Sequence, residues 1–171
     1  GEFTEALDIY DDEIMPILRP VGTQICNSTS LLWRLETLGC DVGDRWQAQL
    51  KLWQKQLDGM SSPFNEIHGA MAASRASDRA AYETLLDGMK RSAANGVELA
   101  PTYRDVALPV SDAMARFADR DYAAPVQRLR GACAQLCRLP ARIAHRDLVA
   151  CTLLLAPTQP GRRTNALSLA Q

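Results

Sequence analysis

The chain has 171 residues, of which 47% are hydrophobic and 23% are charged, and its formal net charge is −1. These values are typical of a globular protein, and nothing in them indicates a nucleic-acid partner. No apolar run approaches the roughly 20 residues of a transmembrane helix, so we expect no membrane partner either.

Neither the cysteines nor the N-terminus indicates secretion. The five cysteines are odd in number and lack paired spacing, which argues against a disulfide framework and predicts a cytoplasmic protein. The sequence begins Gly1-Glu2-Phe3 without Met and shows no signal peptide, so we expect residues 1–3 to be a cloning remnant. We expect residues 1–171 to be a single helical-repeat domain, a fragment of a longer protein.

The first predicted helix covers residues 5–18, where apolar residues recur at helical spacing before Pro16 and Pro20 end it. Residues 1–15 contain six acidic residues and no basic residue. Acidic side chains suit the N-terminus of a helix, which is the simplest explanation for them.

Residues 28–58 have the clearest pattern, that of two helices joined by a short turn. Asn27 or Ser28 is the expected N-cap of the first helix, and Gly39 is its expected end. The second helix follows Asp41 or Asp44. Leucine or tryptophan recurs every three or four residues in both helices: Leu31, Leu32, Leu35, Leu38, then Trp46, Leu50, Trp53, Leu57.

Further helices are predicted along the rest of the chain, and no segment alternates like a strand. Two cover residues 62–74 and about 78–95, and residues 96–104 form a predicted loop. The next helix reaches Phe117, with Pro109 either starting or kinking it. Two more helices cover about 121–139 and 141–155, before a short final one.

A faint internal repeat relates two parts of the chain at an offset of 44 residues. The matching positions are Gly69, Ala81, Leu85 and Gly88 against Ala113, Pro125, Leu129 and Ala132. Degenerate helix-turn-helix repeats of this kind stack side by side. We therefore predict an all-α fold, a right-handed solenoid of antiparallel helix pairs that encloses a concave groove.

Four motifs resemble the tetratricopeptide repeat protein 38 family. They are T-S-L-L-W-R-L at Thr29–Leu35, D-V-G-D-R-W at Asp41–Trp46, F-N-E-I-H at Phe64–His68, and H-R-D at His145–Asp147. The last is shorter by two residues than the family's H-A-Q-R-D, and Glu66 stands where the family has Asp. The resemblance covers most of this chain and the C-terminal part of a typical family member. It implies tetratricopeptide-like helical repeats.

The candidate binding residues lie in or beside these motifs: Arg34, Arg45, Asn65, His68, His145, Arg146 and Asp147. A carboxylate that orients an imidazole is how a general base is built, but Glu66 and His68 are two residues apart and do not share a helix face. Each histidine is more simply explained as a bond between helices. Trp33, Trp46 and Trp53 could line a peptide groove, but tryptophan at helical spacing more often belongs to the core.

The expected function is a non-catalytic scaffold that binds a protein or peptide. The partner could be the missing N-terminal part of the same protein, because residues 116–171 contain nine Arg and three acidic residues. The alternative is a small-molecule or catalytic groove using His68 and His145. Cys133 and Cys137 lie one helical turn apart, but without a second chelating pair we expect no metal and no cofactor.

Overall fold

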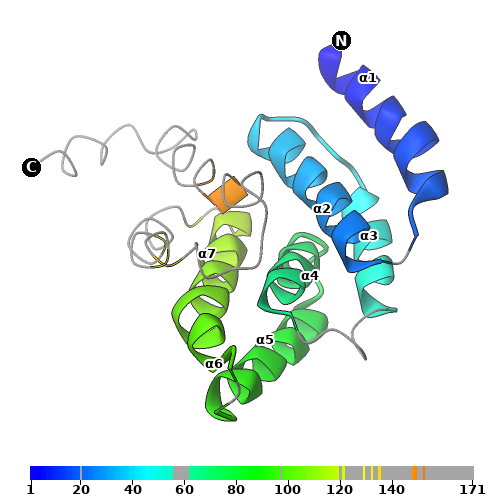
Figure 1. The fold of residues 1–171 in the computed structure, drawn as a ribbon. Coiled ribbons are helices and arrows are strands. Elements are labelled where there is room, and N and C mark those ends of the chain that lie inside the picture. The colour runs from blue at the N-terminus through cyan, green and yellow to red at the C-terminus, as the bar shows by residue number, and fades with distance from the viewer. Residues whose placement is uncertain are drawn as a thin grey trace, which may run out of the picture.

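The computed structural model describes residues 1–19, 21–55, 62–96 and 98–119, together with positions 121, 129, 132, 135, 148, 149 and 152. Throughout this part of the chain the regular structure is helical, so the predicted all-α class is confirmed (Figure 1). The α-helices are α1 (Glu2–Ile9), α2 (Gly22–Thr37), α3 (Arg45–Gln54), α4 (Pro63–Arg75), α5 (Arg79–Ala94), α6 (Ala100–Thr102) and α7 (Leu108–Ala118). The two helices predicted after residue 120, and the short final one, lie outside the described residues, apart from those isolated positions.

Two π-helical turns, Tyr10–Ile14 and Tyr103–Ala107, each end two residues before a proline, at Pro16 and Pro109. Proline lacks an N–H, and its ring collides with the carbonyl four residues earlier in a regular α-helix. A wider π turn relieves that collision and lets the helical path continue. The loop predicted for residues 96–104 is therefore wrong from residue 100 onward, since a helical run continues there to the end of α7.

Helix α2 starts earlier than its sequence suggests. Its N-cap is Val21, so the expected cap at Asn27 or Ser28 is wrong. The Ser28 and Thr29 hydroxyls instead donate to the Ile25 carbonyl, at 3.0 and 2.7 Å, inside the helix. Hydroxyl residues that resemble caps can equally bond back to a carbonyl one turn earlier.

Helices α2 and α4 end in the same way. At the end of α2, Gly39 has a φ of +95°, and the Cys40 N–H donates to the Leu35 carbonyl. At the end of α4 the equivalent residue is Ser77, with a φ of 58°. This left-handed position normally takes glycine, because a side chain there crowds the backbone.

Replacing Ser77 with Gly is expected to stabilise the protein by about 0.5–1 kcal/mol. The left-handed conformation costs serine about 1–2 kcal/mol, which glycine avoids. Part of this gain is lost because glycine has more conformational freedom in the unfolded chain. Urea denaturation followed by circular dichroism measures the change. Ser77→Val is the matched control and should destabilise, because a β-branched side chain fits this conformation least well. A Gly variant less stable than the wild type would contradict the assignment.

Helix α4 is the centre of the described structure and contacts α2, α3, α5 and α7 (Figure 1). Every residue from Glu66 to Ala73 is buried. A helix that is buried on all sides has no face left to line an open groove. The side chains from Glu66 to Ala73 therefore act within the protein, and this decides how the candidate residue His68 is interpreted.

Helices α2 and α4 run parallel. Three side-chain contacts join them along their length, each between residues separated by 38 or 39 positions: Cys26 with Asn65, Ser30 with His68, and Glu36 with Arg75. A constant separation means that the two helices advance in the same direction and in register. This is the relation expected between equivalent helices of neighbouring repeats.

The three tryptophans belong to the core, as predicted, with Trp33 and Trp46 each 2% exposed and Trp53 fully buried. The Trp33 ring lies 5.5 Å from the ring of Phe117 in α7. Its indole Nε1 donates to the Thr152 hydroxyl at 2.9 Å. Residues from three distant parts of the chain thus meet at Trp33, which lies in the protein interior and not on a binding surface.

Candidate functional site

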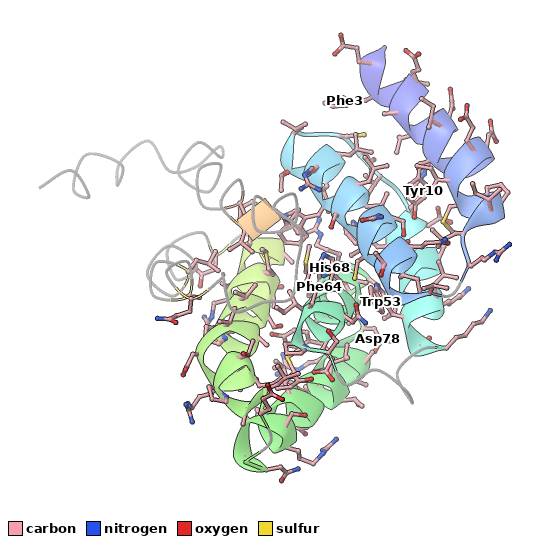
Figure 2. All side chains as sticks on the ribbon, in the orientation of Figure 1. Phe3, Tyr10, Trp53, Phe64, His68 and Asp78 are labelled. Atoms are coloured by element: carbon pink, nitrogen blue, oxygen red, sulfur yellow. The ribbon has the colours of Figure 1, made fainter. Side chains whose placement is uncertain are left out.

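The structure places two of the predicted site residues, Asn65 and His68 of α4, against Cys26 and Ser30 of α2, and a third, Arg34, follows Ser30 by one turn of α2. We define these five residues as the α2–α4 seam. The α2 residues are spaced by four and so form one line along the helix. Figure 2 shows His68 and Phe64 at the centre of the molecule, beside α2.

Both ring nitrogens of His68 have partners in the protein. Its Nδ1 lies 2.8 Å from the Phe64 carbonyl oxygen, and its Nε2 lies 3.0 Å from Ser30 Oγ. Since a carbonyl only accepts, Nδ1 carries the proton, and in the neutral ring Nε2 accepts from the Ser30 hydroxyl. The Phe64 ring packs on the imidazole with centroids 4.5 Å apart. These contacts fix the orientation and tautomer of the ring.

A serine hydroxyl bonded to an oriented imidazole is the arrangement of an activated nucleophile. Here, however, Ser30 and His68 are each only 2% exposed. A substrate needs access to the hydroxyl, and this pair is enclosed between two packed helices. The Ser30–His68 bond therefore joins α2 to α4, which agrees with the simpler explanation of His68.

Next along the seam, the Cys26 thiol donates to Asn65 Oδ1 at 3.3 Å. Burial strongly raises the pKa of Cys26, so the thiol stays protonated and unreactive. Helix α2 also approaches α4 closely at this point, because a Cβ added at Gly22 would lie 2.7 Å from Asn65 Nδ2. Asn65 thus holds the beginning of α2 against α4.

The two candidate arginines do not meet. Arg34 is half-buried at the seam, where its Nη1 lies 3.4 Å from the Ser30 carbonyl oxygen. Arg45, at the start of α3, instead makes two hydrogen bonds to the Asp11 carboxylate, at 3.0 and 2.5 Å. Hydrogen bonding to Asp11 raises the pKa of Arg45. This ion pair ties α3 to the π turn after α1.

The remaining candidates, His145, Arg146 and Asp147, lie outside the described residues, as do Cys133 and Cys137. Convergence of His68 and His145 in one open pocket would favour a ligand site, and the position of His145 is not among those described.

Sequence analysis missed a polar side chain with several hydrogen bonds, Gln49, which is completely buried. Its Oε1 accepts from the Tyr10 hydroxyl at 2.9 Å. Its Nε2 lies 2.8–3.1 Å from three oxygens of α2: Ile25 O, Ser28 Oγ and Thr29 Oγ1. One signal was present, since Gln49 is three residues after Trp46 and four before Trp53, on the apolar face of α3.

A second missed residue, Glu36, connects four helices. Its carboxylate accepts from Trp46 Nε1 at 2.9 Å and pairs with Arg75 of α4. Arg75 in turn donates to the Ala118 carbonyl at the end of α7, at 3.0 Å. Charge-assisted bonds of this kind are stronger than neutral ones and fix geometry.

Glu66 of α4 is a buried carboxyl facing Tyr103 of the second π turn. Burial raises the pKa of Glu66 to about 7, although Tyr103 lowers it in part. Burial and Glu66 together raise the pKa of Tyr103 to about 12. Within the described residues, Glu66 Oε2 and the Tyr103 hydroxyl are buried without a hydrogen bond of normal geometry.

This pKa predicts how stability depends on pH. The folded pKa of Glu66 lies above the ordinary value of 4.5, so the buried charge costs stability progressively as pH rises from 4.5 through 7. Glu66→Gln should therefore be more stabilising, relative to wild type, at pH 8 than at pH 5, by about 1–2 kcal/mol after allowing for solvent screening. Urea denaturation at both pH values measures this, with exposed Glu83→Gln as the control. If Glu66→Gln changed the free energy of unfolding equally at the two pH values, the raised pKa of Glu66 would be contradicted.

No protein-family model matches the sequence, and no solved structure matches the fold significantly. Within the described residues, none of the helices has both the length and the apolar character needed to cross a membrane.

Proposed function

We propose that this chain is a non-catalytic helical-repeat scaffold that binds a protein or peptide partner. In this proposal α2–α3 and α4–α5 are successive antiparallel pairs of a right-handed solenoid, and α7 opens the next pair. The parallel register of α2 and α4, at 38–39 residues, supports it. The offset of 44 residues between Gly69 and Ala113 extends the same relation from α4 to α7.

The resemblance to the tetratricopeptide repeat protein 38 family is part of the proposal. Its first three motifs fall in or next to the helices of these pairs: Thr29–Leu35 lies in α2, Asp41–Trp46 leads into α3, and Phe64–His68 lies at the beginning of α4. Placement of motifs at helix pairs is what a helical repeat requires. The proposed setting is the cytoplasm, which the cysteine content favours.

The observation that carries the scaffold hypothesis is the burial of His68 with both ring nitrogens bonded to the protein. The alternative, a small-molecule or catalytic groove using His68 and His145, requires an imidazole that a ligand can reach. At the α2–α4 seam, the Cys26–Asn65 and Ser30–His68 hydrogen bonds instead join one helix to the other. Arg34 and Asn65 at this seam are half-buried and so remain accessible to a partner.

The test is to identify a partner by affinity capture with the full chain and then measure its binding to purified variants. Arg34→Glu should weaken binding at least tenfold, because it reverses a charge at the accessible edge of the seam. Arg91→Glu on the exposed side of α5 is the matched control and should bind like wild type. A reaction catalysed by the full chain and abolished in a folded Ser30→Ala variant would instead support the catalytic alternative.

A further inference from the structure

The end of α5 carries the dipeptide Asn95-Gly96 on the protein surface. Asn95 is the C-cap of α5, and its backbone N–H donates to the Arg91 carbonyl at 3.0 Å. Gly96 follows with a φ of 65°, the left-handed conformation that commonly ends a helix. Both residues are exposed, and a Cβ added at Gly96 would meet open space. Water therefore reaches both the Asn95 side-chain amide and the peptide that follows it.

The peptide after Asn95 is held less firmly than the peptide before it. Among the described residues, none accepts a hydrogen bond from the Gly96 N–H, whereas the Asn95 N–H is bonded to Arg91. Rotation about the Asn95 Cα–C bond turns the Gly96 nitrogen toward the carbon of the side-chain amide. Glycine obstructs this approach least, because it has no Cβ and adopts many backbone conformations.

We propose that Asn95 is a site of spontaneous deamidation through a cyclic imide formed with Gly96. The Gly96 nitrogen loses its proton and forms a bond to Asn95 Cγ, while the bond from Cγ to Nδ2 breaks. The side-chain nitrogen takes up the proton and leaves as ammonia. Water then opens the five-membered ring at one of its two carbonyls, which gives either aspartate or isoaspartate.

Other positions in the described residues that could form such an imide are held inside helices. Asn27 lies in the middle of α2, and Asn65 lies in α4. Asp87 is also followed by glycine and could form the same imide by losing water, but Asp87 and Gly88 both lie within α5. In a helix the following N–H is bonded to the carbonyl four residues before it, which keeps that nitrogen from attacking. The structure therefore favours Asn95 over these positions.

Both products change the end of α5. Each places a new negative charge at the C-terminal end of the helix, where the dipole opposes it. Isoaspartate also carries the main chain through the side-chain carbon, which lengthens the backbone by one atom between α5 and α6. Helix α6 is anchored there by Ala100 and Thr102, which are buried. Isoaspartate should therefore loosen the junction of α5 and α6 more than aspartate does.

The test is to store the full chain in mildly alkaline buffer and follow each asparagine by peptide mass spectrometry, with unstored chain as the reference. Asn95 should convert to a mixture richer in isoaspartate than in aspartate, at least tenfold faster than Asn27 or Asn65. Gly96→Ala should slow this conversion at least tenfold, because a Cβ obstructs the attacking nitrogen. Equal rates at Asn95 and Asn27, or an unchanged rate in folded Gly96→Ala, would overturn the proposal.

A second variant tests the ring itself and does not depend on Gly96. Asn95→Gln keeps an uncharged amide at this exposed position, but its side chain would have to close a six-membered ring, which forms much more slowly. Folding is checked by circular dichroism, and the variant should show no conversion at position 95. Conversion at the wild-type rate would overturn the cyclic imide.

The last measurement separates the effect of the longer backbone from that of the new charge. Ion-exchange chromatography isolates the stored chain after modification, when isoaspartate predominates. This form should melt at a lower temperature than Asn95→Asp, which has the same charge on an ordinary backbone. Equal melting temperatures would overturn the loosening of the α5–α6 junction.

Discussion

Replacing Trp46 with Ala is expected to lower the free energy of unfolding by about 3–5 kcal/mol, because the change leaves a cavity in the core. Trp46 is 2% exposed, and its indole N–H also binds the Glu36 carboxylate that pairs with Arg75. A small domain has only about 5–15 kcal/mol in total. The melting temperature should fall on the order of 10 °C, measured by circular dichroism.

Trp46→Phe is the matched control and should destabilise less, since phenylalanine fills much of the space but cannot donate to Glu36. If Trp46→Ala instead melted like wild type and lost binding to a partner, Trp46 would belong to a binding surface. The helix pair α2–α3 would then need a different explanation for its packing.

Replacing Gln49 with Leu should destabilise the protein by about 2–4 kcal/mol although the side-chain volume changes little. The loss comes from hydrogen bonding, because the buried Tyr10 hydroxyl loses its acceptor and α2 loses the Nε2 donor. Each buried polar group left unsatisfied costs about 1–3 kcal/mol. Urea denaturation gives the change in the free energy of unfolding.

The double variant Tyr10→Phe with Gln49→Leu separates bonding from packing. Removing both partners leaves no orphaned hydroxyl, so the double variant should lose clearly less stability than the sum of the two single variants. Gln54→Leu, exposed on the same helix, should change stability by less than about 0.5 kcal/mol. If the double variant lost as much stability as the sum of Tyr10→Phe and Gln49→Leu, the hydrogen bond between Tyr10 and Gln49 would be contradicted.

Helix positions could be predicted where local chemistry decides them. Helices α4 and α5 lie close to their predicted bounds, because Pro63 suits a first turn and the Asp78 side chain accepts from Ala81 N–H at 2.9 Å. Gly39 likewise ends α2 because its φ of +95° is a conformation that glycine adopts without strain. These signals act over three or four residues and can be read in the sequence alone.

Other features depend on residues distant in the sequence. The Ser28 and Thr29 hydroxyls could serve as caps or bond inside a helix, and their contacts with Gln49 of α3 favour the second role. The burial of Gln49 needs Tyr10, 39 positions away. The α2–α4 seam likewise forms only once the two helices pack against each other. The sequence could therefore indicate Asn65 and His68 as candidate residues, but it could not show that they bond to α2.

The most direct test of the scaffold hypothesis is a long-range ¹H–¹⁵N NMR spectrum of the His68 ring in the folded chain. If His68 joins α4 to α2, the neutral ring should carry its proton on Nδ1, held by the Phe64 carbonyl, while Nε2 accepts from Ser30. The Nδ1 proton should also exchange slowly with water, because the ring is buried. A ring protonated on Nε2, or one whose proton exchanges rapidly, would contradict the account and favour an accessible site at His68.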